Sequence, residues 1–235
     1  MIMRMRGLFT AITFGLATLV PAAANAADAA DEPALSVAYN AAIVSDYRFR
    51  GLSLTNRKPA IQGGVDITHR SGLFVGTWLS TIASYGGSNV EADVYGGYGG
   101  TAAGFSYSAG VFGYLYPGGR GVNYVELQST IGRTIGPVTT TLTAAYIPSQ
   151  KNSDDNLYLS VDGNLAIGET PFSVQASVGR ENGAYDEKWD WSAGLTYKLD
   201  ALDISASYVD SNYSGALEAG RNGRAGVVVS VKATF

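Results

Sequence analysis

The sequence predicts an all-β protein, an antiparallel transmembrane β-barrel of about 12 strands. Three observations lead to this prediction. The first 26 residues have the plan of a secretory signal peptide. The segments that follow alternate between apolar and polar residues, and each is roughly as long as a tilted membrane strand. The last eleven residues, 225–235, carry apolar side chains at every second position and end on Phe235, as expected where a barrel strand meets an aromatic girdle.

The N-terminal segment reads as a cleaved signal peptide. Arg4 and Arg6 precede an apolar run over residues 7–20, and Ala24-Asn25-Ala26 is a small-residue cleavage site. The apolar run is too short to span a bilayer comfortably. We therefore expect a signal peptide over 1–26, a periplasmic tail over 27–34 and an outer-membrane barrel over 35–235.

The composition excludes several classes of protein. Charged residues make up only 15% of the chain, hydrophobic residues make up 46%, and cysteine is absent. Without cysteine there is neither a disulfide framework nor a thiolate metal site. No block of basic residues points to nucleic acid. The 15 tyrosines suit a membrane interface, where the ring is buried and the hydroxyl stays in water.

Recurring alternation with a period of two, together with glycine throughout, favours strands over helices. An even number of about twelve strands is typical of a bacterial single-chain barrel. The strands are expected over residues 35–49, 59–69, 72–84, 90–102, 104–116, 122–134, 137–149, 156–167, 171–181, 188–199, 201–210 and 223–235.

The connectors between these strands fall into two alternating classes. The tight ones are 70–71, 103–104, 135–137, 168–170 and 199–201. The longer or more polar ones are 50–58, 85–89, 117–121, 150–155, 182–187 and 211–222. Outer-membrane barrels have short periplasmic turns and longer outer loops, so both termini are expected on the periplasmic side. The longer connectors are still short, and the sequence therefore predicts no plug domain and no large folded-in loop.

One predicted strand illustrates the two faces. Trp189, Trp191 and Leu195 share one face, and Asp190 and Thr196 share the other. A soluble barrel has the same alternation with the apolar face turned inward, so alternation alone leaves both arrangements open. The signal peptide, the low charge and the two classes of connector favour lipid on the outside.

Catalysis, a metal site and a bound cofactor are not expected. The chain has one histidine, His69, which flanks a tight turn and has no evident serine–aspartate constellation around it. One histidine without cysteine does not make a typical zinc site.

Charged side chains project toward the predicted lumen. The candidates for a pore lining are Arg48, Asp66, Glu91, Asp93, Glu126, Asp162, Asp190, Lys198 and Lys232, and Asp203 also projects inward. Rings of side-chain charge set ion selectivity, and the excess of acids predicts a preference for cations. Several inward tyrosines narrow the lumen, so an open pore and a filled interior both remain possible.

Three stretches near the N-terminus resemble the signature of the TorF-type porins, an outer-membrane family of Gram-negative bacteria. They are Ser45–Ser53, Pro59–Asp66 and His69–Trp78. The resemblance implies a barrel with a pore and implies no particular solute. In the first stretch, Asp46, Arg48 and Arg50 are expected to share a face at the top of the first strand. Arg48 is expected to pair with an acid on a neighbouring strand, and Gly51 to allow a sharp turn.

The leading functional hypothesis is an outer-membrane channel for passive diffusion of small hydrophilic solutes or ions. The alternatives are a structural or adhesive barrel with a closed lumen and a soluble periplasmic ligand-binding barrel. The expected partners are outer-membrane lipid, periplasmic chaperones and the barrel-assembly machinery, for which Phe235 is the expected recognition signal.

Overall fold

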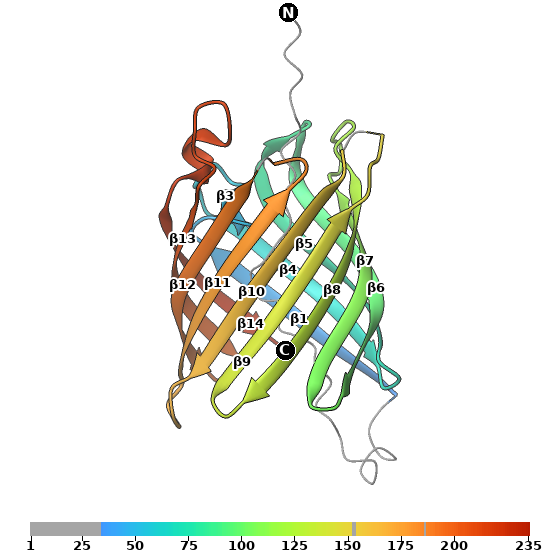
Figure 1. Cartoon of the computed structure of the whole chain (residues 1–235), viewed down its shortest axis with the longest axis vertical. Coiled ribbons are helices and arrows are strands. Elements are labelled where there is room, and N and C mark those ends of the chain that lie inside the picture. The colour runs from blue at the N-terminus through green and yellow to red at the C-terminus, as the bar shows by residue number, and fades with distance from the viewer. Residues whose placement is uncertain (1–33, 152–153, 186) are drawn as a thin grey trace, which may run out of the picture.

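A computed structural model describes residues 34–151, 154–185 and 187–235. Twelve antiparallel strands form one closed barrel in which each strand pairs with its neighbours along the chain (Figure 1). The expected signal peptide and the tail up to residue 33 lie outside the described residues. The strands of the wall are β1 (Leu35–Val44), β4 (Ala60–His69), β5 (Leu73–Tyr85), β6 (Ser88–Ala102), β7 (Phe105–Leu115), β8 (Tyr124–Ile135), β9 (Val138–Ile147), β10 (Asn156–Ala166), β11 (Phe172–Asn182), β12 (Lys188–Leu199), β13 (Leu202–Ser211) and β14 (Gly226–Thr234). The predicted fold class is confirmed.

The two ends of the barrel differ as the connectors predicted. At one end, here called the turn rim, short turns join neighbouring strands (Figure 1). β1 begins and β14 ends at this rim. Between β6 and β7 the turn is two residues long, with Ala103 and Gly104 both at positive φ (51° and 79°). The other end, the loop rim, carries the longer connectors and a short 3-10 helix, η1 (Gly220–Gly223). No helix in the described part of the chain has the length and apolarity to cross a bilayer.

Apolar side chains cover the outside of the wall. On β12 the outward residues Trp189, Trp191 and Leu195 are 42%, 38% and 43% exposed, whereas Asp190 between them is buried. The same alternation runs along β10, β11 and β13. An apolar outer face and a polar interior suit a barrel surrounded by hydrocarbon rather than water.

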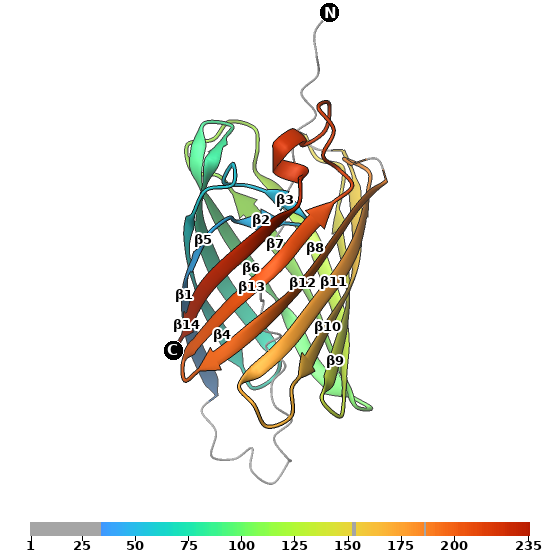
Figure 2. The ribbon, with the colours of Figure 1, turned by 90° about the vertical axis from the view of Figure 1, so that its left-hand side faces the viewer.

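The predicted first strand, 35–49, is wrong beyond Val44. At Ser45 the chain leaves the wall and turns into the barrel, where two short strands, β2 (Arg48–Phe49) and β3 (Leu52–Ser53), form a hairpin (Figure 2). All residues from Asp46 to Ser53 are buried. We call residues 45–58 the plug. The sequence predicts no plug domain and no large folded-in loop. The structure differs in that this fourteen-residue connector enters the barrel, because it forms a compact hairpin.

The tip of this hairpin is a tight turn formed by Arg50 and Gly51. Both residues have positive φ (44° and 83°), as a two-residue hairpin turn of type I′ requires. A Cβ atom at Gly51 would lie 2.7 Å from Cβ of Asp190, so only glycine fits against the wall at this point. The sharp turn expected at Gly51 is confirmed. Because Arg50 lies in the turn itself, it does not share a strand face with Asp46 and Arg48.

Aromatic side chains fill the interior between the plug and the wall formed by β5 to β8. Trp78 packs edge-on against Tyr47 of the plug, with 5.5 Å between ring centroids. The glycine-rich stretch of β6 makes room for a neighbouring ring, because a Cβ at Gly97 would meet the Phe74 ring at 2.7 Å. The core of the molecule is thus the contact between the plug and one side of the barrel.

Candidate functional site

The tip of the plug is held by buried ion pairs from two separate wall strands. Nη2 of Arg50 lies 2.7 Å from Oε2 of Glu126 on β8, and Nη1 lies 2.8 Å from Oε1 of Glu181 on β11. The guanidinium also stacks on the ring of Tyr158, 4.1 Å from its centroid. Arg50 is 3% exposed at its side chain and both carboxylates are 0% exposed. One arginine therefore ties the plug to two distant parts of the wall.

A buried lysine on β12 completes this cluster. Nζ of Lys188 donates to the backbone oxygen of Arg50 at 2.7 Å and lies 2.8 Å from Oε2 of Glu181 and 3.4 Å from Oδ2 of Asp190. Burial acts to lower the pKa of Arg50, but the carboxylates of Glu126 and Glu181 outweigh it and raise that pKa above its ordinary value. The cluster is held by charges that compensate one another inside the barrel.

A second contact joins the plug to β6. The hydroxyl of Tyr47 donates to Oε1 of Glu91 at 2.8 Å, and the hydroxyl of Tyr116 donates to Oε2 of the same carboxylate at 3.1 Å. Burial and then the charge of Glu91 raise the pKa of Tyr47, which keeps its hydroxyl protonated as a donor. Asp93, the next inward-facing residue of β6 after Glu91, is 4% exposed.

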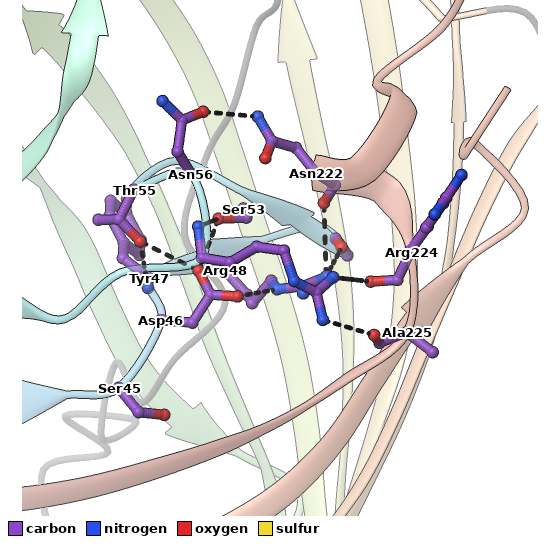
Figure 3. A network of polar contacts seen from close by, with 12 residues as sticks. Ser45, Asp46, Tyr47, Arg48, Ser53, Thr55, Asn56, Asn222, Arg224 and Ala225 are labelled. Atoms are coloured by element: carbon purple, nitrogen blue, oxygen red, sulfur yellow. Dashed lines mark hydrogen bonds and ion pairs between the residues drawn. The ribbon is translucent and has the colours of Figure 1, made fainter. Parts of the chain in front are cut away.

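The base of the plug is organised around Asp46 (Figure 3). Its Oδ1 accepts hydrogen bonds from Oγ of Ser53 at 2.6 Å and Oγ1 of Thr55 at 3.0 Å, and its Oδ2 pairs with Nε of Arg48 at 2.6 Å. Nη1 of Arg48 reaches the backbone oxygen of Arg224, just before β14, at 2.8 Å. Arg48 therefore pairs within the plug, and the expectation of an acidic partner on a neighbouring strand is wrong.

The half of the interior nearer the turn rim contains a sparser set of charges. The hydroxyl of Tyr95 donates to Oδ1 of Asp66 at 2.5 Å, and Oγ of Ser160 donates to Oδ2 of Asp162 at 2.9 Å. Asp203 on β13 lies opposite both Lys198 and Lys232 in the strand register.

The predicted pore-lining residues thus fall into two groups. The structure brings Arg48, Glu91, Asp93, Glu126 and Asp190 together around the plug, whereas Asp66, Asp162, Lys198 and Lys232 lie toward the turn rim.

Four important residues of the site were not among the sequence candidates: Tyr47, Arg50, Glu181 and Lys188. Alternation contained the signal for two of them. Glu181 continues the inward series of β11, and Lys188 is two residues before inward Asp190. Alternation placed Arg50 on one face with Asp46 and Arg48 but gave it no acidic partner, and it did not mark Tyr47. The actual positions of Tyr47 and Arg50 follow from the inward turn at Ser45.

The remaining candidates lie at the surface. His69 is near the turn rim, with Nδ1 2.8 Å from Oγ of Ser71. Within the described ranges no group of histidine and acidic side chains is arranged to hold a metal ion. Phe235 is 73% exposed, and its backbone exchanges hydrogen bonds with Tyr39 of β1 at 2.9 and 3.0 Å.

Comparison with solved structures relates this barrel to outer-membrane channels. A KdgM porin, solved in complex with disordered oligogalacturonate, superposes with a TM-score of 0.58 at 9% sequence identity, covering 85% of this chain and 97% of that one. A NanC porin gives a TM-score of 0.55 at 10% identity, covering 85% and 99%. An outer-membrane channel from Pseudomonas putida F1 gives 0.52 at 10% identity, covering 90% and 98%. At these identities the likeness is one of fold.

At the level of sequence, none of the curated proteins compared with the chain matches it. A family model does match, over residues 27–235, and its description is a bacterial protein of unknown function. Because that match covers the whole barrel, the chain belongs to the Gcw_chp family.

Proposed function

We propose that this protein is a porin-like channel of the bacterial outer membrane, through which small hydrophilic solutes or ions diffuse passively. The observation that carries the proposal is a closed barrel with an apolar outer face and a charged interior. The structural likeness to porins and the resemblance of residues 45–78 to TorF-type porins support it. The function needs neither a reaction nor a cofactor.

The same features support an outer-membrane location. A wall of this length and polarity belongs in a bilayer, and the N-terminal signal would direct the chain across the inner membrane. Outer-membrane lipid, periplasmic chaperones and the barrel-assembly machinery are the proposed partners, with Phe235 as part of the assembly signal.

The plug favours a second candidate function, a barrel whose lumen stays closed. Its buried ion pairs to β8 and β11, and the hydrogen bond that it accepts from Lys188 of β12, fill the interior near the loop rim. A structural or adhesive barrel needs such a filled interior, whereas a channel needs the plug to leave a path or to move. The two functions therefore differ in what the plug does under voltage or in the presence of solute.

Conductance across a planar lipid bilayer tests the two candidates. Val44 and Ala60 are directly opposite in the register of β1 and β4, so a two-residue Asn-Gly turn can replace residues 45–59 and serve as a plug-free reference. A channel gives discrete current steps for the wild-type protein and larger steps for the reference. A closed barrel gives current only for the reference. Slower migration of the protein on gels after heating would verify that both chains fold as membrane barrels.

The finer proposal is a preference for cations. Acidic side chains outnumber basic ones in the interior, and low-dielectric walls strengthen their field. Several of these acids are compensated by Arg50 and Lys188. The proposal therefore rests on the carboxylates nearer the turn rim, Asp66, Asp162 and Asp203, which outnumber the two lysines there, Lys198 and Lys232.

A further inference from the structure

A groove of about 540 Å³ crosses the outer face of the barrel over β8 to β12, which are neighbouring strands of the wall (Figure 1). One row of cross-strand pairs follows its side nearer the loop rim, and this row consists of Ser129, Ala144, Leu159 and Arg180. Apolar side chains such as Leu142 and Val161 line the opposite side. The groove therefore lies on the apolar outer face of the wall, outside the lumen.

The floor of the groove is a pair of small outward side chains. Ser129 on β8 and Ala144 on β9 lie directly opposite each other in the strand register. The next outward pairs of the same two strands are larger in both directions: Leu127 with Tyr146, and Ile131 with Leu142. A small pair between two large ones produces a depression in the outer face, and its mostly apolar lining suits a hydrocarbon chain.

The end of the groove at β11 carries a positive charge. Arg180 faces outward two residues before the end of β11 at the loop rim, and its side chain is 48% exposed. Its guanidinium carbon lies 5.4 Å from the centroid of the Trp189 ring. An arginine on the outer face is costly in mid-bilayer and tolerated near the interface, where tryptophan is also enriched. Arg180 and Trp189 thus mark the level of the lipid headgroups.

The charge of Arg180 is only weakly compensated. Among the described residues, Glu187 is its one ionic partner, at 3.6 Å, and the side chain of this glutamate is 76% exposed. An ion pair between two exposed side chains at this distance contributes little. The guanidinium therefore keeps donors for an anion at the end of an apolar groove.

We propose that the groove binds a lipid with a phosphate headgroup, whose phosphate contacts Arg180 and whose acyl chain lies over Ala144 and Ser129. Guanidinium groups bind phosphate oxygens through short, charge-assisted hydrogen bonds, and the Trp189 ring holds the guanidinium by a cation–π contact. This inference goes beyond the channel function. It requires that the barrel stands in a bilayer and does not require that the barrel conducts.

Quenching of tryptophan fluorescence by brominated lipid tests which lipid occupies the groove. The full chain is used with Trp191→Phe, which leaves Trp189 at the groove and Trp78 inside the barrel. It is reconstituted in phosphatidylcholine vesicles that contain equal minor shares of either dibrominated phosphatidate or dibrominated phosphatidylcholine. The relative affinity for phosphatidate is expected to be roughly fivefold, the factor that one basic side chain supplies at an anionic membrane surface. Equal quenching by the two lipids would overturn the proposal.

Three variants assign this preference to the groove. Arg180→Gln removes the guanidinium and Ala144→Leu fills the floor, and each is expected to abolish the preference for phosphatidate. Arg133→Gln removes the same charge from an exposed position of β8 near the turn rim and is expected to leave the preference unchanged. The fluorescence of each variant is normalised to its own value in vesicles without bromine, and heat-dependent gel migration verifies folding.

The variants also separate the competing explanations. Equal loss of preference in Arg133→Gln and Arg180→Gln would reduce the effect to net charge and refute the site. An unchanged preference in Ala144→Leu would refute the groove as the place of the acyl chain. A dimer in light scattering that dissociates in Ala144→Leu would assign the groove to a second copy of the barrel and likewise overturn the proposal. None of these measurements uses conductance, so a negative result here leaves the channel proposal standing.

Discussion

Nη2 of Arg50 and Oε2 of Glu126 lie 2.7 Å apart inside the barrel, although 76 residues separate them in the sequence. Glu126 belongs to β8, on the far side of the ring from β1, where the plug begins. The same guanidinium reaches Glu181 on β11. The plug therefore spans the barrel, and the side chain of Arg50 anchors its tip to two separate wall strands.

Substitution of that side chain is expected to release the plug. Arg50→Ala leaves Glu126 and Glu181 buried without their counter-charge, and loss of one partner from a buried ion pair costs about 3–5 kcal/mol. The plug can relieve this cost by leaving the lumen. We expect single-channel conductance in planar bilayers to rise severalfold, with a lower temperature of heat-induced unfolding.

Arg133→Ala is the matched control. This arginine lies on β8 near the turn rim and is exposed, and its guanidinium carbon lies 4.8 Å from the centroid of the Phe105 ring. Its removal should leave the single-channel conductance within the experimental scatter of the wild-type value. Wild-type conductance in a correctly folded Arg50→Ala protein would mean that the plug is held by its other contacts.

The orientation of the wall can be tested on two adjacent residues of β12. Leu195 is 43% exposed on the outer face, whereas Oγ1 of Thr196 donates to Oε1 of Gln175 in the interior at 2.8 Å. Leu195→Arg should destabilise the barrel by about 2–4 kcal/mol, because it places a charge in the hydrocarbon zone. Thr196→Arg should be much milder. Urea unfolding in lipid vesicles measures both, and equal losses would contradict a lipid-facing Leu195.

Ion selectivity should depend on the carboxylates nearer the turn rim. In the Arg50→Ala background, Asp66→Asn combined with Asp162→Asn is expected to lower the permeability ratio of cations to anions, measured as the reversal potential across a salt gradient. The preference should fade toward 1 M salt, where the screening length is about 3 Å. Glu126→Gln is less suitable alone, because Glu126 also anchors the plug. A preference for anions before substitution would exclude acidic control of the pore.

Phe235→Ala is expected to reduce the amount of barrel in the membrane without weakening the barrel that does assemble. The ring is 73% exposed and adds little packing, and the hydrogen bonds to Tyr39 involve only the backbone of Phe235. Membrane yield and urea midpoint, measured on the same preparation, separate assembly from stability. A lower midpoint with normal yield would assign Phe235 a packing role instead.

The wall could be predicted from sequence because each strand carries its own signal. The alternation around Asp190 and Leu195 determines which side chains face inward, and turn residues such as Ala103-Gly104 mark where strands end. The plug could not be predicted in this way. Residues 45–49 continue the alternation of β1, and their departure from the wall depends on partners such as Glu126 and Lys188 that are far away in sequence.

The departure of the chain at Ser45 also shapes the junction where the first and last strands close the cylinder. β1 pairs with β14 only over Asn40–Val44, so the part of β14 nearest the loop rim has no strand beside it on that side. There Ser45 exchanges hydrogen bonds with Val229, its amide donating at 2.8 Å and its Oγ accepting at 2.9 Å.

Farther along that junction, Arg48 and Arg57 of the plug donate hydrogen bonds to the backbone oxygens of residues 224 and 225. The plug therefore also stabilises the edge at which β1 and β14 close the barrel. A chain without the plug would lose these hydrogen bonds to the backbone at β14 as well as the segment that fills its lumen. Separation of β14 from β1 would then begin at this edge. Selection for a secure closing edge would then retain these contacts even in a barrel that gained nothing from a narrowed lumen.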